Sequence, residues 1–193
     1  MRIVLALTLI SATAFLIAGF QQLDSNLEAT AKVESSSVDE VDPDLSKLSK
    51  YKNWTLVNQE PFLMDPRTAA LCAAVQRQSP HSNKYISVYV NGEGRESMMT
   101  RLEPSFPVGS MIIKEKLPSK DSKTPELLTA MIKHEKGYYP EGGDWEYLLL
   151  DGAASKIIER GKLESCNSCH TMYKTRDFVT RTYLPADVVR ELK

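Results

Sequence analysis

The sequence carries the motif C-x-x-C-H close to its C-terminus, as Cys166, Cys169 and His170, and only residues 171–193 follow it. This spacing is typical of covalent haem attachment, in which two thiols add to the haem vinyl groups and the histidine binds the iron. Because the motif comes so late, most of the surrounding fold and any second protein ligand to the iron must come from upstream. The motif therefore predicts one covalently bound haem c with His170 as the iron ligand.

Two other kinds of site also use a C-x-x-C pair, namely redox-active dithiols and zinc sites. A redox dithiol does not need the following histidine. A zinc site needs two more ligands, and the remaining Cys72, His81 and His134 show no paired spacing. If Cys166 and Cys169 hold haem, Cys72 is left alone. We then expect no intramolecular disulfide framework and an inert, buried Cys72 thiol.

The N-terminal residues 3–20 are apolar and uncharged, and Arg2 precedes them. This pattern is typical of a signal peptide, and the run is also just long enough to span a bilayer. No clean A-x-A cleavage site follows, so a cleaved signal peptide and a retained membrane anchor both remain open. Either one predicts a periplasmic or otherwise extracytoplasmic protein. The membrane would be contacted only through residues 1–20, if they stay attached.

The rest of the chain divides into an acidic stretch and one domain. Residues 21–50 combine low hydrophobicity with many acidic side chains and predict a disordered linker. Residues 51–193 are then a single domain of ordinary size. A formal net charge of −1 and the lack of a Lys/Arg run argue against nucleic-acid binding.

Helix and strand signals alternate within the domain, which predicts an α+β fold with an antiparallel sheet. Strands are expected at 85–90, 110–116 and 145–150, helices at 65–78, 95–102, 153–160 and 186–193, and a strand or a helix at 127–134. This order excludes small electron-transfer cytochromes c, which carry the haem motif near the start. It also excludes a four-helix cytochrome c′, because the strand-like segments leave no room for four helices.

Four ordered segments resemble the cytochrome P-460 family, which includes the β-sheet cytochromes c′. They are Val88-Tyr-Val90, Phe106-x-x-Gly109 leading into Ile112-Ile-Lys-Glu115, Gly143-Asp-Trp-Glu-Tyr147, and the C-x-x-C-H motif followed by Lys174-Thr and Thr180-Arg-x-Tyr183. The resemblance covers residues 54–185. It implies a curved antiparallel sheet flanked by helices, a homodimer, and a five-coordinate haem with His170 on the proximal side.

The resemblance also implies two kinds of activity. The P-460 branch cross-links a lysine to a haem meso carbon and oxidises hydroxylamine or, in some members, nitric oxide; electrons would leave to a soluble cytochrome. The other branch lacks the cross-link and binds nitric oxide or carbon monoxide. Lys114 falls on the cross-linking position. By strand alternation it shares a face with Ile112 and Lys116, which reads equally well as a solvated face.

The distal side departs from the oxidising branch. Oxidation of hydroxylamine releases protons, which a nearby carboxylate would accept. Thr129 stands where that branch has a glutamate, and Glu126 could serve only if the strand register slips. Ile86 occupies a second distal position that is polar in the family. This less polar pocket favours small diatomic ligands.

Arg176 and Arg181 follow the haem motif and could pair with the haem propionates or be ordinary surface charges. The sequence therefore predicts an exported mono-haem protein that binds, and as an oxidoreductase would oxidise, small nitrogen compounds. The alternatives are a non-enzymatic gas-binding protein and an electron-transfer cytochrome. The last needs a sixth ligand, and the candidate His134 lies in a charged, exposed patch.

Overall fold

The computed structural model describes residues 42–64 and 83–193, and Val41–Lys193 form one compact unit. The predictions for residues 1–41, for the helix at 65–78, and for Cys72 and His81 lie outside the described residues. Within the described part, no helix is both long and apolar enough to cross a membrane.

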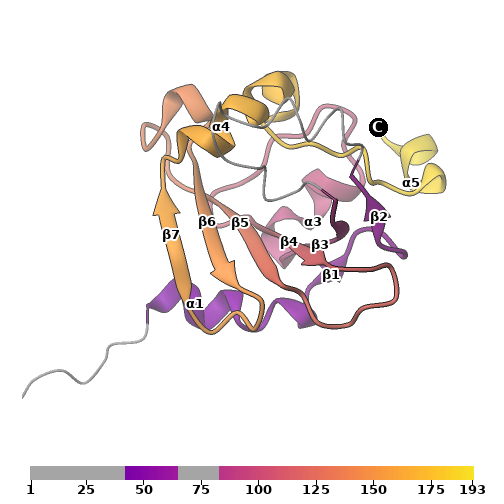
Figure 1. The fold of residues 1–193 in the computed structure, drawn as a ribbon. Coiled ribbons are helices and arrows are strands. Elements are labelled where there is room, and N and C mark those ends of the chain that lie inside the picture. The colour runs from indigo at the N-terminus through magenta and orange to yellow at the C-terminus, as the bar shows by residue number, and fades with distance from the viewer. Residues whose placement is uncertain (1–41, 65–82) are drawn as a thin grey trace, which may run out of the picture. The chain divides into compact units, whose positions relative to one another are not determined.

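An open antiparallel sheet of seven strands forms the body of this unit (Figure 1). The strands are β1 Thr55–Leu56, β2 Phe62–Leu63, β3 Tyr85–Val90, β4 Met111–Leu117, β5 Leu127–Lys133, β6 Trp145–Asp151 and β7 Ile157–Gly161. Their order is β1-β3-β4-β5-β6-β7, and β2 pairs with the other half of β3. The α+β fold class with an antiparallel sheet is confirmed.

Short helices flank the sheet. They are α1 Pro43–Leu48, α3 Gly92–Met99, α4 Glu164–His170 and α5 Ala186–Glu191, with 3-10 turns η1 Tyr51–Asn53, η2 Pro140–Gly142 and η3 Thr171–Arg176. In Figure 1, α1 and α4 lie at opposite ends of the drawn sheet. The C-x-x-C-H motif occupies most of α4.

The helix expected at 153–160 is wrong, because β7 occupies Ile157–Gly161 and pairs with β6. The Asp151 carboxylate accepts the backbone N–H groups of Ser155 and Lys156 at 2.7 and 2.9 Å and closes a tight turn after β6. The chain therefore reverses into a strand where the sequence pattern alone indicates a helix.

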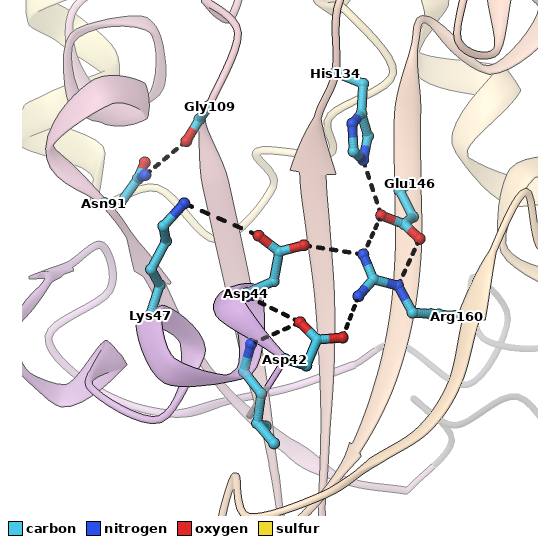
Figure 2. Close-up of polar contacts among 9 residues, drawn as sticks. Asp42, Asp44, Lys47, Asn91, Gly109, His134, Glu146 and Arg160 are labelled. Atoms are coloured by element: carbon cyan, nitrogen blue, oxygen red, sulfur yellow. Dashed lines mark hydrogen bonds and ion pairs between the residues drawn. The ribbon is translucent and has the colours of Figure 1, made fainter. Parts of the chain in front are cut away.

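The disordered linker expected to reach residue 50 is wrong over residues 42–50, where α1 and the turn after it are folded. Asp42 caps α1 by accepting the N–H groups of Asp44 and Leu45 at 2.9 and 3.3 Å. Arg160 of β7 binds the same two acidic residues, through Asp42 at 2.7 Å and Asp44 at 3.0 Å (Figure 2). Leu48 is fully buried, so the folded unit begins about ten residues earlier than expected.

The two faces of the sheet have different covers. We call the face that carries Val88, Lys114 and Thr129 the C-terminal face, because residues from the end of the chain pack on it. The opposite N-terminal face packs against Leu48 and Tyr51. The core of the C-terminal face includes Ile86, Val88, Val90, Ile112, Met131, Trp145, Tyr147, Phe178, Val179, Tyr183 and Leu184.

Candidate functional site

His170 ends α4 with its imidazole ring buried against the C-terminal face. Its Nδ1 lies 2.6 Å from the backbone carbonyl oxygen of Phe178. Because a carbonyl only accepts, Nδ1 carries the proton and donates it, and Nε2 keeps a free lone pair. Burial, aided by the charge of Lys114, lowers the pKa of His170 to about 3. The ring is therefore neutral, in the tautomer that suits a metal ligand.

Tyr147 of β6 packs against this histidine. The two rings have their centroids 5.2 Å apart at 58°. The Tyr147 hydroxyl reaches the side-chain oxygen of Asn167 in α4 at 3.4 Å. These contacts join the middle of α4 to the sheet and limit rotation of the His170 ring.

Lys114 and Lys116 of β4 point toward the same face as His170. The side chain of Lys114 is 5% exposed and that of Lys116 is 0% exposed, so the interpretation of this face as solvated is wrong. Tyr183 covers it, with its ring centroid 5.3 Å from the Lys114 Nζ. The alternation of residues along β4 correctly predicted that both lysines share one face. It did not predict that Tyr183 covers this face.

Burial makes both amines easier to deprotonate. It lowers the pKa of Lys114 to about 8, although the nearby Cys166 opposes the change. The pKa of Lys116 falls well below its ordinary value, first because of burial and then because of the charge on Lys114. Neutral amines are nucleophiles and proton acceptors, which solvated lysines are not.

Two buried polar atoms on this face lack a hydrogen-bond partner among the described residues, namely the Nζ of Lys116 and the hydroxyl of Tyr183. Buried polar atoms in native proteins almost always have partners. The third such atom is the Nε of Arg181, whose other guanidinium nitrogens donate to backbone carbonyls. The Lys116 and Tyr183 side chains lie on the face against which the His170 ring packs. This arrangement fits a haem attached at α4, with the iron held by His170.

Cys166 and Cys169 lie three residues apart on α4, so about one helical turn separates them. Cys166 is a free thiol whose pKa is raised by burial. Cys169 is disulfide-bonded, whereas the expectation of no disulfide framework applies to a chain in which both thiols of the motif hold haem. Attachment of haem at Cys169 therefore requires reduction of that bond first.

The two candidate distal residues separate in the structure. Thr129 pairs with Lys114 across β4 and β5 and is half-buried on the same face. Glu126 precedes β5, is exposed, and forms an ion pair with Lys84. The register places Thr129 beside Lys114, and Ile86 beside Lys116. The structure thus brings Thr129 to the site and leaves Glu126 at the surface.

The two arginines after the motif also separate. Arg176 is exposed at the end of η3. Arg181 is buried, and its guanidinium donates to the backbone carbonyls of Arg101 at 2.6 Å and Leu102 at 2.8 Å, just after α3. Arg181 therefore ties the C-terminal segment to α3, a role that the sequence analysis did not anticipate.

His134 lies away from the site. Its Nε2 is 2.8 Å from Glu146, and its ring stacks on Tyr138 at 4.2 Å. It is half-buried rather than fully exposed. Figure 2 shows it beside the ion pair of Glu146 and Arg160.

Sequence reasoning missed three residues of the site: Lys116, Tyr147 and Tyr183. Lys116 was noted only as a neighbour of Lys114, and the two tyrosines only as parts of the resemblance. The signals in the sequence were the position of Lys116 two residues after Lys114, and the places of Tyr147 and Tyr183 in the segments that carry the resemblance. None of these signals predicts which side chains are buried together.

Comparison with known proteins gives one finding for the family. The family model Cytochrome P460 matches residues 49–181, which include every strand of the sheet and the C-x-x-C-H motif. No curated protein matches the chain. The buried histidine, the paired lysines and the family match agree with one another, and the chain belongs to the cytochrome P460 family of haem proteins.

Proposed function

We propose that this protein is an exported mono-haem c protein of P460 type that binds small nitrogen compounds, nitric oxide or hydroxylamine, and oxidises hydroxylamine. The observation that carries the proposal is the burial of Lys114 and Lys116 on the face that also holds the neutral His170 ring. A bound haem c supplies an iron that coordinates the ligand and passes electrons on.

Each residue of the site has a role in this proposal. Cys166 and Cys169 would hold the haem through thioether bonds, and His170 would bind the iron through Nε2. Lys114 is the residue for a cross-link to the haem, since its amine is buried and has a pKa of about 8. With this pKa, roughly one Lys114 side chain in ten is neutral and nucleophilic at pH 7, far more than for a solvated lysine. The cross-link would replace an amine N–H bond and a meso C–H bond by one C–N bond, with two protons released and two electrons passed to an external oxidant of the peroxide class.

Lys116 is the proton acceptor in this proposal, in place of the glutamate that the oxidising branch has at the position of Thr129. Thr129 cannot take a proton as a carboxylate does, but the neutral amine of Lys116 can. Its neighbours across the sheet, Ile86 and Leu127, are apolar and keep its pKa low. Hydroxylamine oxidation releases protons, so this amine favours turnover over gas binding alone.

A second candidate function is the binding of nitric oxide or carbon monoxide without turnover. The observation that favours it is the apolar surroundings of Lys116, where Ile86 replaces a polar residue. Ligands of this kind need little proton handling. An electron-transfer role is less well supported, because it requires a second strong axial ligand.

The test is the mass of the haem-bearing proteolytic peptide after expression with haem maturation machinery. We expect haem to join the peptide that contains Cys166 and Cys169 to the one that contains Lys114, and the Lys114→Met variant to lose this joint peptide. Hydroxylamine turnover would then be measured, with Lys116→Met expected to slow it. Haem on the first peptide alone would favour gas binding, and no haem would overturn the proposal.

Export and assembly complete the proposal. We expect the protein in the periplasmic or membrane fraction and, as in its family, a homodimer. Cell fractionation and analytical ultracentrifugation test the two statements separately. An electron acceptor, such as a soluble cytochrome, would be needed for turnover.

A further inference from the structure

The carbonyl that accepts the His170 proton belongs to a turn with an unusual backbone. Asp177 and Phe178 both have left-handed conformations, with φ of 51° and 62°. Such a conformation is uncommon for residues other than glycine, and for a bulky aromatic residue it is disfavoured. It persists only where the surrounding structure holds it.

Contacts from three other segments hold Asp177 in this turn. One carboxylate oxygen pairs with the Nζ of Lys133 at 2.6 Å, and the other accepts the backbone N–H of Phe106 at 2.8 Å. The carbonyl of Asp177 accepts the indole N–H of Trp145 at 2.8 Å. The turn is thus fixed from β5, from β6 and from the loop before β4.

Lys133 also holds Gly143, against which the Phe178 ring packs. Its Nζ donates to the carbonyl of Gly143 at 2.8 Å and lies 5.1 Å from the Trp145 ring centroid. The Phe178 ring packs against Gly143 so closely that a Cβ there would lie 2.3 Å from the ring. One amine therefore anchors both the Asp177 carboxylate and the surface on which Phe178 rests.

The ion pair of Lys133 and Asp177 is mostly buried, with side chains 13% and 14% exposed. No described contact joins either residue to His170 directly. Their effect on His170 passes through one atom, the Phe178 carbonyl oxygen, 2.6 Å from Nδ1. A hydrogen bond accepted from the distant nitrogen of a metal-binding imidazole orients the ring and makes it a stronger donor to the metal.

We propose that Lys133 and Asp177 are positioning residues for His170. They hold the left-handed turn at 177–178 so that the Phe178 carbonyl accepts the Nδ1 proton, and they thereby set the strength of the bond between His170 and the haem iron. The inference rests on the proposed function, because it takes His170 as the iron ligand.

The sign of the effect follows from ligand basicity. A more basic imidazole stabilises the ferric iron more than the ferrous iron. Release of the 177–178 turn weakens the hydrogen bond to Nδ1 and makes His170 a poorer donor. The ferric–ferrous equilibrium then moves toward the ferrous form, and the reduction potential rises.

The experiment compares haem-loaded Asp177→Asn and Lys133→Met proteins with the wild type. Asparagine tolerates the left-handed conformation, so Asp177→Asn removes the charge without imposing new backbone strain. We expect a roughly tenfold shift of the equilibrium toward the ferrous form in each variant, about 59 mV for one electron. We also expect a lower iron–histidine stretching frequency in the ferrous protein.

Glu146→Gln is the matched control, because Glu146 is a buried member of another ion pair, with Arg160 at 2.7 Å. It should reduce stability but change neither the potential nor the stretching frequency. If Asp177→Asn does not fold, Lys133→Met alone decides. Haem-loaded variants with both readouts unchanged would overturn this inference only, whereas a wild type that attaches no haem would overturn the proposed function with it.

Discussion

The two faces of β4 treat buried charge in opposite ways. On the N-terminal face, Glu115 is 2% exposed and accepts a hydrogen bond from the Tyr51 hydroxyl at 2.6 Å. It also forms an ion pair with Lys52. On the C-terminal face, Lys114 and Lys116 are equally buried, and the Nζ of Lys116 has no hydrogen-bond partner within the described part of the chain.

The difference separates structural from functional polar groups. Arg160 on β7 continues the pattern of the N-terminal face, since it contacts Asp42, Asp44 and Glu146 together (Figure 2). Charges that stabilise the fold are paired there. On the C-terminal face, the Lys116 Nζ lacks a hydrogen-bond partner within the described chain, and a group bound beside His170 would supply one.

A substitution at Arg160 tests whether the paired charges of the N-terminal face stabilise the fold. Arg160→Met leaves the buried carboxylate of Glu146 without its main partner, and we expect the free energy of unfolding to fall by about 3 kcal/mol. That figure is at the low end for a buried pair because Arg160 is about one-third exposed. Urea unfolding at pH 7 measures it, with Arg101→Met, which loses an exposed pair with Glu96, as the control.

The pH dependence of this loss has a definite sign. Burial raises the pKa of Glu146, but hydrogen bonds from Arg160 and His134 outweigh it, so the pKa lies below its ordinary value of 4.5. Such a carboxylate contributes stability above pH 4.5, and this contribution is lost as the pH falls through the lowered pKa. The gap between wild type and variant should close in acid. A gap that stays constant down to pH 2 would contradict the assignment.

Lys116→Met tests the other face, with the opposite sign. We expect the haem-free protein to gain about 2 kcal/mol, since the substitution removes a buried amine without a hydrogen-bond partner. Urea unfolding measures it, and Lys120→Met at an exposed position is the control. The gain should shrink once haem is attached, and a loss of stability in the haem-free protein would show that the amine has a partner.

The cost of burying either lysine, Lys114 or Lys116, also depends on pH. A lysine whose folded pKa is lowered disfavours folding at low pH, and the penalty disappears as the pH approaches the unfolded value of 10.5. For Lys114, the window runs from about 8 to 10.5. Wild-type stability should rise through that window, and the Lys114→Met variant should show a flatter profile.

Tyr51→Phe and Tyr183→Phe form a matched pair that sharpens the contrast. Tyr51→Phe removes the hydrogen bond to Glu115 and should cost about 1 kcal/mol. Tyr183→Phe removes a hydroxyl without a partner in the described structure and should cost nothing or stabilise slightly in the haem-free protein. Thermal unfolding of both variants measures the difference, and equal costs would remove the distinction between the two faces.

The smallest expected effect is at Glu126. Glu126→Gln removes an exposed ion pair with Lys84 and should change stability by less than about 0.5 kcal/mol. Ligand binding and hydroxylamine turnover of the haem-loaded protein should be unchanged. A strong loss of turnover would mean that Glu126 reaches the iron after all, against the register of β4 and β5.

The sequence predicted the strands well where apolar and β-branched residues alternate, as in β3 and β6. It failed at 153–160, because Ile157 and Ile158 fit a helix until the Asp151 turn and the pairing with β6 are known. It also failed at 42–50. The acidic residues there resemble a linker, and their partner Arg160 lies more than a hundred residues away.

The sequence reveals the C-x-x-C-H motif of the candidate site but not the side chains that surround it. The motif at Cys166, Cys169 and His170 is local and can be read from spacing. The burial of Lys114 and Lys116 depends on Tyr183 and on the C-terminal segment, which no local pattern places against β4. The sequence rule that charged residues face solvent fails here, as it often does where a ligand binds.

The ion pairs of Arg160 with Asp42 and Asp44 limit where the chain can be cleaved without loss of contacts that hold the fold. Proteolytic removal of residues up to 41 would leave both carboxylate partners of Arg160 and the buried Leu48 in place. Removal of only seven more residues would take away the helix cap, both carboxylates and a core side chain. Any cleavage that keeps these contacts must therefore fall before Asp42.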